Sequence, residues 1–232
     1  MWIIFDPMYF VFLAPALILM AIAQFWIRSA FAKYSQVTTS SQMTGAEVAR
    51  AILEANGIYD VRVEISEGFL SDHYDPMEKV LRLSPEVYHS PSAAAVGVAA
   101  HEVGHAIQHA KGYVPLYVRS ALVPLVQLGS TLYLPLLLLG MFLASFQLFM
   151  AGIICFGAIA VFQIVTLPVE FDASARAIRQ IQELGIVRGE EVVGAKRILT
   201  AAALTYVAAA IQSVLTILYY LWRAGLLGGG DD

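Results

Sequence analysis

The sequence of residues 120–169 is SALVPLVQLGSTLYLPLLLLGMFLASFQLFMAGIICFGAIAVFQIVTLPV, and it contains no Asp, Glu, Lys or Arg. A helix needs about 20 apolar residues to cross about 30 Å of hydrocarbon, so this run is long enough for two crossings. We therefore expect a membrane hairpin with spans near 121–143 and 146–167, turning around residues 145–147.

The rest of the chain has the same character. Hydrophobic residues make up 59% of its 232 residues, charged residues only 14%, and the mean hydropathy is +0.69. Such a composition is too apolar for an ordinary soluble domain. Two further runs, 8–27 and 201–222, are each long enough for one span. The sequence predicts a mainly α membrane protein with four transmembrane helices in the lipid bilayer.

The first apolar run has an alternative interpretation as a secretory signal peptide. It lacks a basic segment before the apolar stretch, carries Asp6 there instead, and has no clear small-residue cleavage site. These features favour an uncleaved membrane anchor.

The distribution of Lys and Arg predicts the orientation. Eight lie between Arg28 and Arg119, five between Arg176 and Arg197, and one at Arg223. Because basic residues concentrate on the cytoplasmic side, we expect both segments in the cytoplasm and both termini outside the plasma membrane. Acidic residues are as numerous there and the net charge is −4, so we expect no nucleic-acid partner.

The segment 101–105 is His101-Glu102-Val103-Gly104-His105, an HExxH pattern. On a helix, residues i and i+4 share a face, so His101 and His105 can bind one zinc ion with Glu102 beside it. The pattern predicts a metal hydrolase in which Glu102 is the general base.

The residues around this pattern suggest a small α+β unit. Thr44 and Glu47 form a capping box for a helix at 45–56, alternating residues predict strands at 61–65 and 80–83, and 71–76 has the composition of a loop. Ser90 as N-cap and Pro91 at the first helical position predict an HExxH helix at 91–111. That helix is too polar around His101 for a membrane span, so we expect it in the core of the unit.

Catalytic zinc takes three protein ligands, so a third ligand is needed. His109 continues the helical series, but it lies about 12 Å along the axis from His101 and cannot share a metal with it. Glu170 follows the predicted hairpin, which returns the chain to the same membrane face, so we expect Glu170 to be the third ligand. Cys155, the only cysteine, lies within a span and is an unsuitable ligand.

His73 lies in the predicted loop between the two strands, where it is either an exposed histidine or a donor to a developing oxyanion. Tyr74 and Arg176 are weaker candidates of the same kind.

Several strings resemble the YugP-type family of prokaryotic neutral zinc metallopeptidases. They are Phe5-Asp6-Pro7-Met8-Tyr9, residues 71–76 and 83–88, the HExxH segment 101–110 and residues 170–174. The resemblance implies a membrane-embedded zincin with His101, His105 and Glu170 as ligands and Glu102 as base. The family is similar to HtpX-like and CAAX-processing metallopeptidases, which have an aspartate four positions after the glutamate. Here that position is Ser174, so the role of that aspartate in supporting the metal ligands falls to Ser174 or Asp172.

These inferences give the following expected organisation: a first transmembrane helix (1–27), a cytoplasmic zincin-like unit (28–119), a transmembrane hairpin (120–168), a cytoplasmic helical segment with the third metal ligand (169–200), a fourth transmembrane helix (201–223) and a frayed tail (224–232).

The leading functional hypothesis is an integral membrane zinc metallopeptidase that hydrolyses peptide bonds of membrane or membrane-proximal proteins at the cytoplasmic face. One alternative is a noncatalytic membrane adaptor with structural zinc, although such zinc usually has four protein ligands. Another is an intramembrane protease, which would place the HExxH inside a span.

Overall fold

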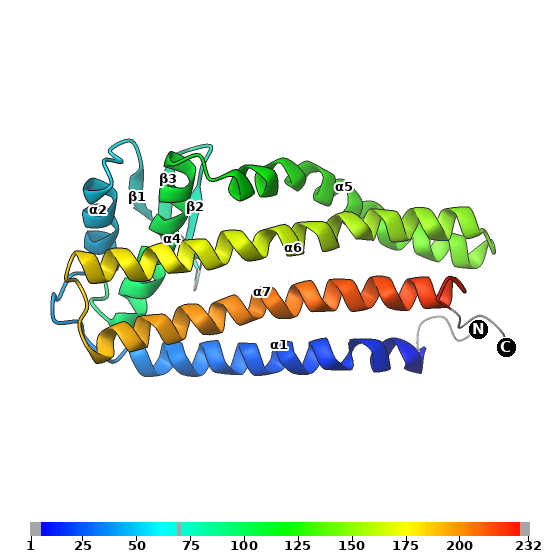
Figure 1. Cartoon of the computed structure of the whole chain (residues 1–232), viewed down its shortest axis with the longest axis horizontal. Helices are drawn as coiled ribbons and strands as arrows, with labels where there is room; N and C mark the ends of the chain where they lie inside the picture. Colours follow the sequence, from blue (N-terminus) through cyan, green and yellow to red (C-terminus); the bar gives the residue numbers. More distant parts are fainter. Residues whose placement is uncertain (1–5, 69–70, 228–232) are drawn as a thin grey trace. The chain divides into compact units, whose positions relative to one another are not determined.

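The computed structural model describes residues 6–68 and 71–227 (Figure 1). The first five residues of the expected first span, with Phe5, and residues 228–232 of the expected tail lie outside the described residues. The chain forms two compact units. The first comprises residues up to Ile22, Val118–Leu167 and residues from Thr205, and the second comprises Ala23–Tyr117 and Pro168–Leu204.

Within the described ranges, four helices are long and apolar enough to cross a membrane, which confirms the expected number. They are α1 (Pro7–Tyr34), α5 (Val114–Phe142), α6 (Phe146–Glu183) and α7 (Glu190–Arg223). In the first unit, large apolar side chains such as Val11 and Ile154 are 61% and 69% exposed. Water would not favour so much exposed apolar surface, whereas lipid would.

The turn between α5 and α6 lies at residues 143–145, slightly earlier than expected, and Phe146 already begins α6. The two helices approach closely at Gly140, where an added Cβ would lie 2.4 Å from the backbone nitrogen of Phe149. A residue without a side chain is therefore required for this hairpin. At the ends of α1 and α7, the hydroxyl of Tyr219 donates to Asp6 Oδ2 at 2.7 Å.

The helices α6 and α7 extend beyond the expected spans. Past Pro168, α6 continues to Glu183 and buries Val169, Ala173, Ala177 and Ile181, each at most 1% exposed. Ala177 and Ile181 of this stripe at four-residue spacing belong to the apolar core cluster of the second unit, and this packing stabilises the extension. The helix α7 begins at Glu190, where acidic residues favour a helix N-terminus.

A three-stranded sheet in the order β1-β3-β2 lies in the second unit. The strand β1 (Arg62–Ile65) is parallel to β3 (Val80–Leu83), and β2 (His73–Asp75) is antiparallel to β3. Because β1 is an edge strand, its burial does not alternate as expected, and Ile65 is 50% exposed. In the central strand β3, Val80, Leu81 and Leu83 are fully buried.

The prediction of a loop at 71–76 was wrong, because His73–Asp75 within it form the strand β2. The backbone of β2 pairs with β3, and this ladder outweighs the turn preference of the local residues. A turn follows β2, and Asp75 Oδ1 accepts hydrogen bonds there from the backbone nitrogens of Met77 and Glu78, at 2.8 and 3.0 Å.

Along the chain, one helix precedes this sheet and another follows it. The helix α2 (Gly45–Ala55) has the expected capping box and ends before Gly57, whose φ is +69°. A short helix, α3 (Pro85–Tyr88), follows β3 and was not anticipated from the sequence. Ile52 of α2, Leu81 of β3 and Val103 of the HExxH helix belong to one buried apolar cluster.

The HExxH helix, α4, spans Ala93–Ala110, two residues shorter at its start than expected. Ser92 is the N-cap instead of Ser90, and its hydroxyl accepts from the Ala95 nitrogen at 3.2 Å. Pro91 is not the first helical residue, because its carbonyl oxygen accepts from Thr39 in an extended segment. Gly112, with φ +66°, follows the end of the helix as expected.

The capping box gives a test of this fold. Thr44→Ala removes the hydroxyl that accepts from the Glu47 nitrogen at 3.3 Å, and we expect the free energy of unfolding to fall by about 1 kcal/mol. Thermal or denaturant unfolding of the detergent-solubilised protein measures this change. Thr200→Ala is the control, because this exposed hydroxyl bonds only its own helix, to the Lys196 carbonyl. Equal losses in both variants would contradict the role of the cap.

Candidate metal centre

Three side chains from two helices of the second unit converge at one point. His101 and His105 come from α4 and Glu170 from α6, and one ligand atom from each lies within 4.8 Å of the others. The side chains of His101, His105 and Glu170 are only 12%, 10% and 3% exposed. The structure thus brings together the three residues that the sequence analysis selected as ligands.

The distances in this cluster fit a zinc site. Glu170 Oε2 lies 3.2 Å from His101 Nε2 and 3.6 Å from His105 Nε2. Tetrahedral zinc with ligands at about 2.0–2.1 Å places the ligand atoms about 3.3 Å from one another. Two imidazoles and one carboxylate are also a donor set found in catalytic zinc sites, so the residues fit the metal.

Gly104 allows the two helices to meet at this point. A Cβ atom at residue 104 would lie 2.5 Å from the carbonyl oxygen of Ala173 in α6. Real Cβ atoms do not approach an oxygen so closely, so any other residue would separate α4 from α6. The glycine inside the HExxH pattern therefore has a packing role: it lets Glu170 reach the two histidines.

Glu102 is partly exposed beside the cluster. Burial by itself lowers the pKa of His105, but the hydrogen bond to Glu170 and the charges of Glu102 and Glu170 outweigh it, so this pKa lies above its usual value. The carboxylates thus create a negative local field that favours a bound cation.

Asp72 is a neighbour of Glu102 that the sequence analysis did not single out. Its Oδ1 accepts from the nitrogen and the hydroxyl of Ser84, at 2.8 and 3.1 Å. Burial raises the pKa of Asp72, and the charge of Glu102 adds to this effect. No local sequence pattern links residues 72, 84 and 102, because the link comes from the way the strands pack.

Each histidine has a polar partner at its other ring nitrogen. His101 Nδ1 lies 3.1 Å from the Ser174 hydroxyl, and His105 Nδ1 lies 3.1 Å from Gln108 Oε1. Gln108 was missed as a site residue, although its position three residues after His105 places both on one helix face. Asp172, the other residue considered beside Ser174, contacts Gln108 instead.

The structure places the weaker candidates elsewhere. Tyr74 faces α4 and its hydroxyl bonds His109 Nδ1 at 2.9 Å. Successive strand residues point to opposite faces, so His73 faces away from α4, is exposed, and bonds the Ser71 carbonyl at 2.8 Å. Neither histidine joins the metal cluster. Arg176 donates a hydrogen bond to Asp172, which is not one of the three residues of the metal cluster.

Comparison with known proteins identifies the family of the chain. The family described as "Putative neutral zinc metallopeptidase" matches residues 9–225. The chain belongs to this family. It is 48% identical over 226 residues to the "Putative membrane protease YugP" of Bacillus subtilis (strain 168), an alignment that covers 97% of this chain and 100% of that relative. No solved structure matches the chain. The family resemblance predicted from the sequence is confirmed.

Gly104→Ala tests the close approach of α4 and α6. The added methyl group forces the helices apart, and such overpacking costs about 1–3 kcal/mol in unfolding free energy. We expect less zinc per purified chain than in the wild type, by elemental analysis. Gly157→Ala is the matched control, because a Cβ there meets nothing within 4 Å. Wild-type zinc content in Gly104→Ala would contradict the argument.

Proposed function

We propose that this protein is an integral membrane zinc peptidase of the zincin type, which hydrolyses peptide bonds of membrane or membrane-proximal proteins. The observation that carries this proposal is the convergence of His101, His105 and Glu170 within 4.8 Å. Membership of a neutral zinc metallopeptidase family supports it.

Each residue has a defined part in the reaction. His101 and His105 would hold the metal through their imidazole rings, and Glu170 would hold it through its carboxylate. Zinc, when bound, supplies Lewis-acid chemistry, making water more acidic and polarising a substrate carbonyl. Glu102, next in sequence to His101, accepts the proton of the attacking water and passes a proton to the leaving amine.

The number of protein ligands favours catalysis over a structural role. In residues 6–68 and 71–227, the cluster contains three candidate ligands. Structural zinc usually has four protein ligands, whereas catalytic zinc keeps one position for water or substrate. A partly exposed carboxylate at Glu102 supports the same conclusion, since a structural site has no need of a base.

We place the site at the cytoplasmic face of the plasma membrane, with both termini outside. The Lys and Arg residues, concentrated in 28–119 and 176–197, support this orientation. Glu170 follows the end of the apolar segment of α6 at Leu167 by less than one helical turn. Substrates held at or near the membrane surface would therefore reach the site most readily. Lipids and a peptide or protein substrate are the expected partners.

Measurements on the wild type and on the variants Glu102→Gln and Glu170→Ala separate metal binding from catalysis. We expect about one zinc per chain in the wild type and in Glu102→Gln, and loss of zinc in Glu170→Ala. Cleavage of an unfolded test protein such as casein, abolished by chelator and restored by zinc, should occur only in the wild type. In Glu102→Gln it should fall at least about 100-fold, the usual contribution of a general base.

Three outcomes would contradict this proposal. Cleavage retained in Glu102→Gln would exclude this glutamate as the base. Zinc bound by the wild type without any hydrolysis would favour the noncatalytic adaptor, and zinc retained in Glu170→Ala would exclude Glu170 as a ligand.

Single cysteines test the location of the site. After Cys155→Ala, a cysteine introduced at the exposed Lys111, just after α4, should react with a membrane-impermeant maleimide only in inside-out vesicles. A cysteine introduced at Ala144, in the α5–α6 turn, is the control and should react only from the opposite side. Labelling of both positions from one side would overturn the topology.

A further inference from the structure

Gln108 is a fully buried polar residue at the metal cluster, with an exposed fraction of 0%. Its side-chain nitrogen donates to the Val169 carbonyl oxygen at 2.7 Å and to Asp172 Oδ2 at 2.9 Å. Its side-chain oxygen lies 3.1 Å from His105 Nδ1. One side chain thus joins a candidate ligand of α4 to the helix that supplies Glu170.

These contacts fix which way the amide points. A backbone carbonyl can only accept a hydrogen bond, so the atom facing Val169 must be the amide nitrogen. The amide oxygen must then face His105, and since that oxygen can only accept, Nδ1 of His105 must carry the proton. In the neutral imidazole, which is the form that binds metal, the lone pair is consequently on Nε2, the atom that faces Glu170.

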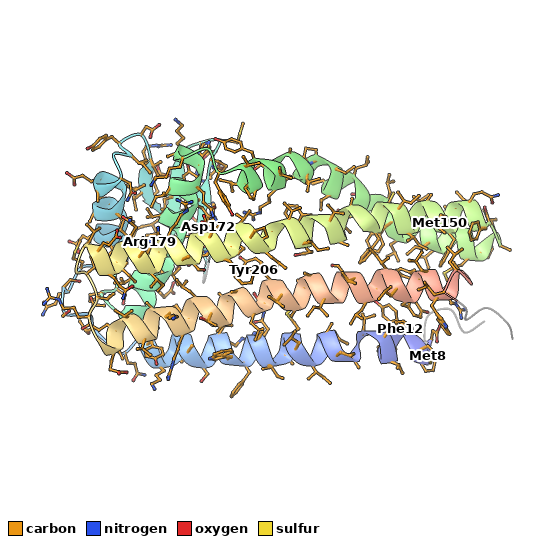
Figure 2. All side chains as sticks on the ribbon, in the orientation of Figure 1. Met8, Phe12, Met150, Asp172, Arg179 and Tyr206 are labelled. Atoms are coloured by element: carbon orange, nitrogen blue, oxygen red, sulfur yellow. The ribbon has the colours of Figure 1, made fainter. Side chains whose placement is uncertain are left out.

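Asp172 is itself held in place. Arg176, one helical turn further along α6, donates from Nε to Asp172 Oδ2 at 2.5 Å. The guanidinium group of Arg176 lies over the ring of Tyr113, 5.6 Å from its centroid. Figure 2 shows Asp172 on α6, with Arg179 farther along the same helix towards its C-terminal end. The acceptor for Gln108 is therefore fixed by a charged partner.

We propose that Gln108, Asp172 and Arg176 form a clamp that positions His105 and sets its tautomer for metal binding. Gln108 acts through His105 and is a positioning residue. The inference rests on the proposed function, because it assumes that His105 binds zinc. Ser174 differs from Gln108: its hydroxyl can rotate and either donate to His101 or accept from it, so it does not fix a tautomer.

Gln108→Leu keeps most of the volume and removes every hydrogen bond of the clamp. We expect the zinc dissociation constant, measured by competition with a chromophoric chelator, to rise by about 10- to 100-fold, as is usual when the partner of a ligating histidine is lost. The visible absorption spectrum of the cobalt-substituted protein should also change, because His105 is no longer held in one orientation. Gln182→Leu, an exposed glutamine of α6, is the matched control and should leave both readouts unchanged.

Asp172→Asn is a second variant for the case in which Gln108→Leu does not fold. It preserves size and removes the charge that holds the amide nitrogen of Gln108 and the side chain of Arg176, so we expect a smaller rise in the zinc dissociation constant. The clamp is disproved if either folded variant binds zinc with wild-type affinity and gives a wild-type cobalt spectrum.

The failures of the two proposals are distinguishable. If the wild type binds no zinc, the proposed function and the clamp fail together. If the wild type binds zinc but cleaves nothing, the proposed catalytic function fails, and the zinc affinity of the variants still decides on the clamp.

Discussion

The candidate site depends on the close contact between α4 and α6 at Gly104. Two candidate ligands and the proposed base are on one helix, and the third candidate ligand is on the other, so the site exists only where the helices meet. An added Cβ at residue 104 would lie 2.5 Å from the Ala173 carbonyl oxygen, which shows how little space separates them. On α6, Ala173 at this contact and the nearby Val169 are both fully buried.

This contact also explains the polar arrangement around the site. Ser174 and Asp172 of α6 are within hydrogen-bonding range of His101 and Gln108 of α4 only because the backbones are so close. One short stretch of α6 provides the candidate ligand Glu170, the polar partners Asp172 and Ser174, and the buried apolar residues Val169 and Ala173. A metal ion bound at this cluster would therefore stabilise the folded second unit, because a ligand that binds only the folded state stabilises that state.

Much of this site was predictable because its signals are local. The i, i+4 spacing of His101 and His105 and the charge-free runs depend on helical geometry alone. Glu170 was accessible by a topological argument, since a hairpin returns the chain to the same side. The capping box at Thr44 was equally local.

The errors have a common physical cause. The strand β2 was missed because its pairing with β3 overrides the turn preference of Asp and Pro. Ser92 replaces Ser90 as the cap because Pro91 pairs with the distant Thr39. The orientation of His73 depends on which face of its strand meets α4. The proximity of Asp72 to Glu102 depends on tertiary packing. Gln108 is the exception, because its spacing from His105 was visible in the sequence.

The helix α6 is continuous from the apolar segment that begins at Phe146 to the end of the helix at Glu183, and Glu170 lies within it. Successive residues of a helix turn by about 100° around its axis. One residue inserted between Glu170 and Ala173 would therefore rotate Glu170 by about 100° relative to the buried residues Ala173, Ala177 and Ile181 and turn its carboxylate away from the two histidines. The site thus depends on the exact length of this stretch of α6 as well as on which residue stands at position 170.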